Sequence, residues 1–232
     1  MNNPLHILET LDRHLAVPAE ITLFGRAALA LGYAPCPAAF AATLDVDAIL
    51  PLAWLAAEDE NLDFWEAQQR TNAELEPAGL YFTHLFRELE VILTPDWLTR
   101  RVRIRLELQR LAVFRPATLD LILTKMARGD ENDLADIAFL LTREPVTADH
   151  LRVAFARARL PDVPEIQAFF APLSPKSWPW RKLNEMQIPL LRNRRAASAR
   201  EGVGHGRTHP VISTVSFASF ASFAGPPPPS SG

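Results

Sequence analysis

The beginning of the chain alternates between helical and strand-like spacings of apolar residues. Leucines recur every three or four positions, which predicts a helix over residues 4–16. Residues 20–24 form a short apolar run that stops at Gly25 and predicts a strand. The Ala- and Leu-rich residues 26–31 follow at once and predict the beginning of a second helix. We therefore expect a helix, a strand and a helix in that order.

Residues 43–50 alternate between apolar and polar positions, which is the period of a strand with one buried face. Asp45 and Asp47 project from one face of this strand. The other face carries Leu44, Val46 and Ala48. A charged, amphipathic helix is predicted from residue 54 to about residue 74. Its aromatic residues are expected in the core rather than on a base-stacking surface: Trp54, Phe64 and Trp65.

Two more strands are predicted before the sequence turns helical. Residues 89–93 are a short apolar run, and residues 101–109 have the cleanest alternation in the chain. Residues 111–114 extend that strand or pair with it. One face of it is a basic stripe, which indicates either a solvated face or a surface that steers a triphosphate or an RNA end. The stripe consists of Arg101, Arg103 and Arg105.

Apolar stripes at helical spacing predict three helices after Pro116. Thr147 is the expected N-cap of the third helix, because a threonine hydroxyl can accept a hydrogen bond from a free N–H group of the first turn. The element order predicts an α/β (α+β) protein. In such a fold a mixed sheet is flanked by helices, and here a helical C-terminal half follows.

The composition is that of an ordinary globular protein. The 232 residues are 48% apolar and 22% charged, which suits one domain with a sizeable core. A formal net charge of −3 is too small to argue for a nucleic-acid binder or a membrane-surface protein. The single cysteine, Cys36, excludes a disulfide framework and is expected as a small apolar filler in a reducing compartment.

The two ends of the chain lead to different expectations. The N-terminus lacks the features of a secretory signal, and no apolar stretch approaches the roughly 20 residues that cross a bilayer. We therefore expect a cytoplasmic protein without membrane contact. Residues 197–232 contain a Ser-Phe-Ala repeat and a proline run, which predict a disordered tail. The basic run at residues 181–200 is expected as a linker or helix end, with contact to a polyanion as the alternative.

Asp45 and Asp47 are the strongest candidates for chemistry. Residues two apart on a strand share a face, and their backbone origins are about 7 Å apart. Two carboxylates held so close repel one another unless one is protonated or a cation lies between them. A hard divalent ion such as Mg²⁺ suits oxygen ligands of this kind. The pair therefore predicts a metal site, with a solvated strand face as the alternative.

Gly25 stands between a predicted strand and a predicted helix. Glycine there lets backbone N–H groups and a helix N-terminus approach a phosphate closely, although an ordinary strand-to-helix turn also favours glycine. The six histidines, His84 among them, show no metal-ligand spacing. The sequence also contains no Walker loop, nucleophile elbow or Rossmann fingerprint.

This combination resembles the minimal nucleotidyltransferase superfamily. It is most similar to bacterial members of unknown function and more distantly to the nucleotidyltransferase-type toxins of toxin–antitoxin pairs. The resemblance extends over about residues 20–142. Beyond the glycine turn and the Asp-x-Asp strand, three runs carry it: Thr-Pro-Asp-Trp at 94–97, Lys-x-x-Arg at 125–128 and Asp-x-x-Asp at 133–136.

The resemblance implies a nucleotidyltransferase-like sheet and the following domain organisation. An N-terminal helix in residues 1–19 precedes the α/β core of residues 20–115. A helical part in residues 116–196 and the tail from residue 197 complete the chain.

The activity implied by the resemblance is Mg²⁺-dependent transfer of a nucleoside monophosphate. The donor would be a nucleoside triphosphate, and the acceptor a hydroxyl of an RNA, a protein or a small molecule. Gly25 would form the phosphate turn, and Asp45 and Asp47 would bind the metal. A third carboxylate comes from a neighbouring strand in this family. Glu90 is preferred to Glu107 for that role, because it precedes the Pro-Asp-Trp run.

The charged residues downstream have two interpretations. Lys125, a catalytic candidate, either neutralises phosphate or extends from a helix surface. Together with Arg128 it is also a candidate for nucleotide binding. Asp133 and Asp136 lie three apart on one predicted helix face, where they would meet Lys125 or Arg128. Those contacts serve either the nucleotide or the packing of two helices.

Arg26 departs from the pattern, because active families usually have a small Gly or Ser directly after the glycine. A cation at this position would crowd the triphosphate or bind it. Two hypotheses therefore stay open. One is an active, metal-dependent nucleotidyltransferase. The other is an inactive protein of the same fold that binds or regulates a partner protein, such as a toxin–antitoxin component.

Overall fold

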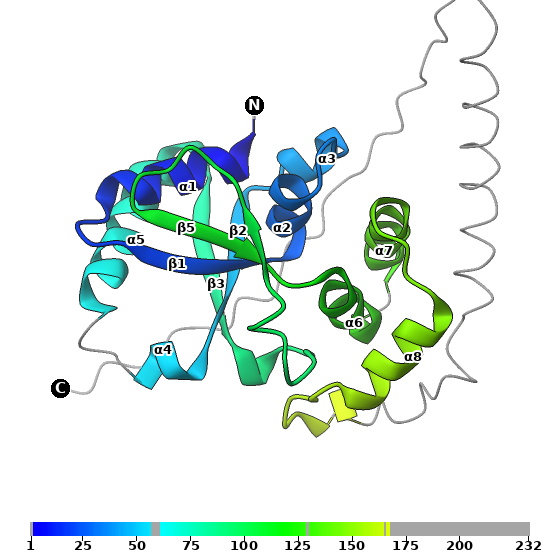
Figure 1. Cartoon of the computed structure of the whole chain (residues 1–232). Helices are drawn as coiled ribbons and strands as arrows, with labels where there is room; N and C mark the ends of the chain where they lie inside the picture. Colours follow the sequence, from blue (N-terminus) through cyan, green and yellow to red (C-terminus); the bar gives the residue numbers. More distant parts are fainter. Residues whose placement is uncertain (1, 57–60, 129, 165, 168–232) are drawn as a thin grey trace, which may run out of the picture. The chain divides into compact units, whose positions relative to one another are not determined.

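A single mixed β-sheet organises the described part of the chain (Figure 1). The computed structural model describes residues 2–56, 61–128, 130–164 and 166–167. Within these ranges the sheet has five strands in the order β3-β2-β1-β5-β4. The expected α/β architecture with a mixed sheet is confirmed.

The strands run in both directions. Their bounds are β1 Ala19–Phe24, β2 Asp45–Leu50, β3 Tyr81–Arg87, β4 Val102–Ile104 and β5 Leu111–Arg115. The central strand β1 pairs antiparallel with β2 and parallel with β5. β2 pairs parallel with the edge strand β3, and β5 pairs antiparallel with the other edge strand, β4.

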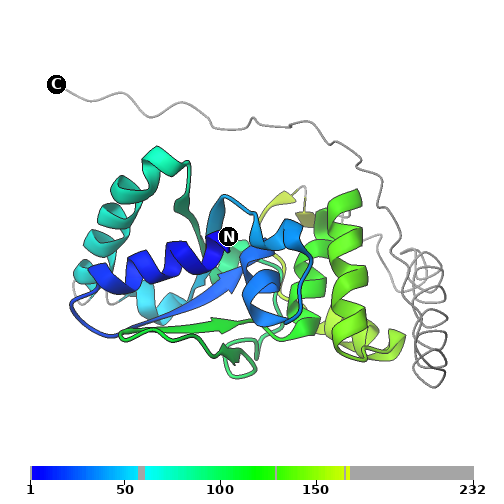
Figure 2. The ribbon, with the colours of Figure 1, turned by 90° about the horizontal axis from the view of Figure 1, so that it is seen from above.

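The helices form two groups around this sheet. Helices α1, α2 and α5 cover one face, and α6, α7 and α8 pack together beside it (Figures 1 and 2). The first group and the short elements near it are α1 Asn3–His14, α2 Gly25–Gly32, α3 Ala38–Ala41, α4 Leu52–Ala56, α5 Leu62–Leu75 and the 3-10 turns η2 Glu76–Ala78 and η3 Glu88–Glu90. The second group is α6 Thr118–Arg128, α7 Glu131–Arg143 and α8 Ala148–Arg157.

The main core lies between the sheet and the first group of helices and continues into α6, α7 and α8. Ile21 and Leu23 of β1 are buried there together with Val46 and Ala48 of β2. Because successive side chains of a strand point to opposite faces, burial of these four residues turns the alternate positions of both strands to the other face of the sheet. This is the first step in positioning the two aspartates of β2.

The long helix predicted from residue 54 is divided in the structure. The segment contains α4 and α5, and α5 begins only after Asn61. The side-chain amide of Asn61 donates to the carbonyl of Trp54 at 2.8 Å, a local bond that competes with helical backbone hydrogen bonds. The prediction for the aromatic residues is confirmed, because Trp54, Phe64 and Trp65 contact one another edge to face against the main core.

The prediction of a strand at residues 89–93 is wrong. Residues 88–90 form the turn η3 instead, and Leu93 makes only an isolated bridge with Arg159. The carboxylate of Glu90 accepts hydrogen bonds from the backbone N–H and the guanidinium of Arg87. This capping box satisfies the free donor at the start of the turn, and so it favours a turn over an extended run.

The strand predicted at residues 101–109 is correct only at its start, where Val102–Ile104 forms β4. Its partner in the hairpin, β5, begins at Leu111, so the residues between the two strands have to reverse the chain. Leu106 and Leu108 still pack against the core from this connection. The alternation of apolar residues therefore predicts their burial correctly, but it extends beyond Ile104, the last residue of β4.

The three helices predicted after Pro116 are confirmed as α6, α7 and α8. Thr147 caps α8 as expected, because its hydroxyl accepts from the N–H of His150 at 3.1 Å. None of the helices in the described ranges has the length and apolar character that crossing a membrane requires. The predicted basic run at 181–200 and the predicted tail at 197–232 lie outside the described residues.

Asp12 of α1 ties the helical layer to the start of β5. Its buried carboxylate accepts backbone N–H groups from Gln109 at 2.9 Å, Arg110 at 2.7 Å and Leu111 at 2.8 Å. Burial raises the pKa of Asp12, but these three hydrogen bonds outweigh it and hold the pKa below the ordinary value of 3.8. The charged carboxylate therefore stabilises the fold.

Replacement of Asp12 with Asn is expected to lower the free energy of unfolding at pH 7 by about 2 kcal/mol, because hydrogen bonds to a charged acceptor are lost. The folded pKa lies below the unfolded one, so this stabilisation is complete above pH 3.8 and is lost as the pH falls through the folded pKa. Urea unfolding of both proteins across this pH range measures the difference. A difference that stays constant down to the folded pKa and below it would contradict the assignment.

Candidate metal centre

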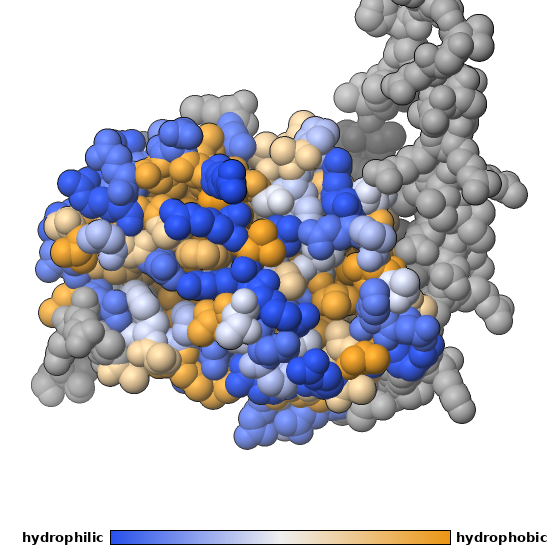
Figure 3. Space-filling model, in the orientation of Figure 1, coloured by the Kyte–Doolittle hydropathy of each residue, from blue (hydrophilic) through white to orange (hydrophobic). Residues whose placement is uncertain are grey.

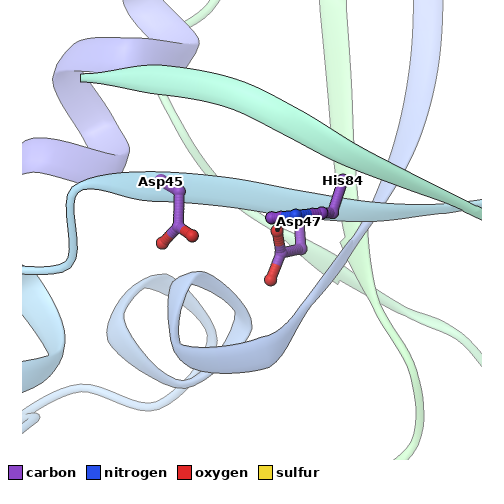
Figure 4. Close-up of side chains that lie close together, drawn as sticks. All are labelled: Asp45, Asp47 and His84. Atoms are coloured by element: carbon purple, nitrogen blue, oxygen red, sulfur yellow. Dashed lines mark hydrogen bonds and ion pairs between the residues drawn. The ribbon is translucent and has the colours of Figure 1, made fainter. Parts of the chain in front are cut away.

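Asp45 and Asp47 alternate along β2 with the buried residues Val46 and Ala48, so they lie on its other face. In the register of β1 and β2, Phe24 is the partner of Asp47 and Leu23 is the partner of Ala48. The two carboxylates point to the same side of the strand (Figure 4). The hydroxyl of Thr43 donates to Asp45 Oδ1 at 2.8 Å. The predicted placement of both acids on one strand face is therefore confirmed.

A β-bulge in the edge strand β3 brings His84 to this face. Val46 is paired with Phe82 and Ala48 with Leu85, so the single residue Asp47 faces two residues of β3, Thr83 and His84. The extra residue shifts the alternation of the strand, and a bulge of this kind re-aims side chains. Without the bulge, the side chain of His84 would point to the same face as that of the buried residue Phe82, two positions earlier.

Three possible metal ligands converge at this point (Figure 4). One ligand atom each from Asp45, Asp47 and His84 lie within 4.8 Å of one another. His84 Nδ1 is 3.0 Å from Asp47 Oδ1, and the imidazole stacks on the ring of Phe86 with the centroids 5.9 Å apart. The side chain of His84 is 63% exposed and that of Asp47 is 23% exposed, so an ion from solvent can reach both.

Gly25 closes one side of this centre. Its φ of +60° is the left-handed conformation that glycine adopts without strain. A Cβ atom added at Gly25 would lie 3.0 Å from Asp47 Oδ2, so the turn and the carboxylate are in close contact. α2 begins at this glycine, and the side chain of its N-cap residue, Phe24, makes no capping hydrogen bond. The helix N-terminus and its N–H groups therefore start beside Asp47.

Arg26 is directed toward α7. Its guanidinium donates to Asn132 Oδ1 at 3.1 Å and lies 3.7 Å from Asp136 Oδ2. Asp136 also binds Lys125 Nζ at 2.6 Å, and Asp133 Oδ1 lies 3.4 Å from the same ammonium. Lys125 and both aspartates are buried. The predicted meeting of these three charged residues is confirmed.

The remaining predicted residues lie elsewhere. Glu90 is outside the group of Asp45, Asp47 and His84, and the hydrogen-bonded Arg87 guanidinium holds the pKa of its carboxyl below the ordinary value, although burial opposes this. Glu107 is exposed in the connection between β4 and β5. Arg128 ends α6, and its side chain lies outside the described part.

The basic stripe is partly engaged within the fold. Arg101 forms an ion pair with Glu20 at 2.5 Å, and its guanidinium lies 3.9 Å from the ring centroid of Phe114. Arg103 lies 5.9 Å from the same ring. Arg105 is in the connection after β4 and is exposed. Rows of hydrophilic residues lie on the surface over β1 and β5 (Figure 3), which agrees with the interpretation of a solvated strand face.

His84 is the member of this centre that sequence reasoning missed. Its strand was not predicted, although the aromatic and β-branched run at residues 81–86 after Gly79 is a strand signal. Even with the strand in place, simple alternation would put His84 on the same side as the buried Phe82. Only the bulge places His84 beside Asp47, and nothing in the sequence marks the bulge.

Comparison with known proteins identifies the family of the chain. Residues 7–160 match the profile of a family described as a nucleotidyltransferase of unknown function (DUF6036). No curated protein and no solved structure matches the chain significantly. The matched residues contain the whole sheet, the centre on β2 and the helices α6 and α7. Because the match covers well over half of the chain, this protein belongs to that family of nucleotidyltransferases of unknown function.

Proposed function

We propose that the protein transfers a nucleoside monophosphate from a nucleoside triphosphate to a hydroxyl group of an RNA, a protein or a small molecule. One observation carries this proposal. Two carboxylates share one strand face, and one of them, Asp47, lies against a glycine turn from which a helix begins. Such a site offers ligands for a cation and backbone donors for phosphate side by side.

Each residue has a role in the proposed reaction. Asp45 and Asp47 would hold a divalent ion, Mg²⁺ in the simplest case, which would supply charge neutralisation for the triphosphate. The Gly25 turn and the first N–H groups of α2 bind phosphate oxygens. The acceptor oxygen forms a bond to the α-phosphorus and loses its proton to water. The bond between the α-phosphorus and the bridging oxygen breaks, and pyrophosphate leaves with the electron pair.

The positions of Arg26 and Lys125 support different roles for these two positively charged side chains. Arg26 follows the phosphate turn directly and its side chain is 38% exposed, so we assign it to the leaving pyrophosphate. Its contacts with α7 draw the guanidinium to one side, which argues against crowding of the triphosphate. Lys125 is enclosed by Asp133 and Asp136. We therefore assign Lys125 and these two acids to positioning α7 and, through it, Arg26.

Label transfer tests the proposed activity. The protein is incubated with each α-³²P nucleoside triphosphate, with Mg²⁺ or Mn²⁺, and with RNA, protein and small-molecule acceptors in turn. Wild type is expected to label an acceptor and release pyrophosphate. The Asp45→Asn/Asp47→Asn variant is expected to lose label by a factor of at least about 100, because removal of the charge for the metal removes transition-state stabilisation.

Asp149→Asn is the matched control, since Asp149 is an exposed acid on α8. It is expected to keep wild-type labelling. Absence of label with every triphosphate, acceptor and metal contradicts the proposal. If Mg²⁺ and a triphosphate then also fail to raise the melting temperature of wild type, the second hypothesis, a non-catalytic binding or regulatory protein, replaces it.

Two glycines allow the phosphate turn to be tested separately from stability. Gly25 and Gly79 both have positive φ, +60° and +65°. Alanine at either is expected to cost about 1–2 kcal/mol of stability, because it strains the backbone. Only at Gly25 would the new methyl meet Asp47, since nothing lies within 4 Å of the Gly79 position.

Gly25→Ala is therefore expected to lose both label transfer and the thermal shift with a triphosphate, whereas Gly79→Ala keeps them. Thermal melts with and without nucleotide, together with the labelling assay, measure the two effects. Equal labelling by the two variants would show that the turn at residue 25 does not contact the nucleotide.

A further inference from the structure

We infer that Asp45, Asp47 and His84 form a mixed oxygen–nitrogen site that binds a divalent transition-metal ion, one that accepts an imidazole ligand, more tightly than Mg²⁺. The inference rests on the proposed function for the role of the two aspartates and adds the third ligand and the class of metal. His84 comes from β3, the strand next to β2, and its ring lies at the carboxylate pair (Figure 4).

The separation of the ligand atoms supports joint binding. His84 Nδ1 and Asp47 Oδ1 are 3.0 Å apart. Two ligand atoms that each lie about 2.1 Å from one ion, at right angles to one another, are also about 3.0 Å apart. Asp45 contributes an atom within 4.8 Å of both. A small closure of the Asp45 side chain completes a three-ligand site.

The surroundings of His84 fix the orientation of its ring. The imidazole stacks on Phe86 with an angle of 19° between the ring planes. The hydroxyl of Thr83 lies 3.3 Å from the same nitrogen, Nδ1, that faces Asp47. Because Thr83 and His84 are the two bulge residues, the backbone irregularity presents both of them to Asp47. Nδ1 therefore lies where it can serve as a ligand once an ion replaces its contact with Asp47.

The donor set determines which ion is preferred. Mg²⁺ takes oxygen ligands and keeps much of its water, whereas imidazole nitrogen suits ions such as Co²⁺ and Zn²⁺. Two carboxylates with one imidazole leave the other coordination positions open, which is how metal sites that act on a substrate are built. The nitrogen thus shifts selectivity while the open positions leave room for phosphate oxygens.

Metal binding without nucleotide tests this inference on the intact chain. Co²⁺ is the probe, because its visible absorption reports ligand changes, and Mg²⁺ is added as competitor. Wild type is expected to bind Co²⁺ more tightly than Mg²⁺. His84→Ala is expected to weaken Co²⁺ binding by at least about 10-fold, as loss of an imidazole ligand does, with a much smaller effect on Mg²⁺. His84→Asp, which restores an all-oxygen site, is expected to reduce the preference for Co²⁺ over Mg²⁺.

Two controls identify the site. His150→Ala removes an exposed imidazole on α8 and is expected to leave Co²⁺ binding unchanged. Asp45→Asn/Asp47→Asn is expected to remove binding of both ions. A melting temperature for each variant confirms that it is folded.

The outcomes separate this inference from the proposed function. Co²⁺ binding that does not depend on His84, or an unchanged preference in His84→Asp, overturns the inference. Loss of label transfer in His84→Ala with unchanged Co²⁺ affinity overturns it too, and assigns the imidazole to proton transfer. Binding that follows His84 as expected, with no label transferred by wild type, upholds the metal site and contradicts the proposed activity.

Discussion

The register between β1 and β2 is the constraint on which the candidate metal centre depends. Ile21 and Leu23 face the helices together with Val46 and Ala48, and a slip by one residue would move the core-facing residues of a strand into solvent. The hydrophobic core thus holds two carboxylates on one face, although they repel one another. The same register puts Phe24 opposite Asp47, so the chain leaves β1 and turns at the next residue directly beside that carboxylate.

Much of the fold could be predicted because apolar residues recur at the period of the helix or strand whose face they bury. This spacing predicts the helix α1, the strands β1 and β2 and the three helices α6, α7 and α8. The errors occur where a local hydrogen bond decides the backbone. Glu90 binds back to Arg87 and makes a turn where an apolar run predicted a strand. The strand predicted at residues 101–109 ends at Ile104, and the backbone N–H groups of Gln109 and Arg110 donate to Asp12 of α1 instead of pairing with a strand. The first contact joins residues three apart and the second joins residues almost 100 apart, and the period of apolar residues in the sequence records neither.

The candidate site could be predicted to the extent that it lies on one strand and one turn. Asp45, Asp47 and Gly25 were accessible from spacing alone, since each stands within a short periodic segment. His84 was not, because its position depends on a bulge that sets two residues of β3 against one of β2. A bulge changes which face a side chain occupies without changing composition. The third ligand of a site on a sheet is therefore best sought on the neighbouring strand, at whichever residue an irregularity turns toward the first two.

Contacts with the distant helix α7 change the role that can be assigned to Arg26. In the sequence it is a bulky cation at the position where a phosphate turn needs space. In the structure Asn132 and Asp136 of α7 engage its guanidinium. Asp136 is buried, and a buried carboxylate is tolerated only when cations and hydrogen bonds compensate its charge. Lys125 supplies most of that compensation at 2.6 Å, which leaves Arg26 at a looser 3.7 Å and partly exposed. The α6–α7 pair thus keeps Arg26 beside the turn without fixing it there. In the proposed reaction, Arg26 would exchange its distant contact with Asp136 for a phosphate oxygen, whereas Lys125, enclosed by two carboxylates, would not.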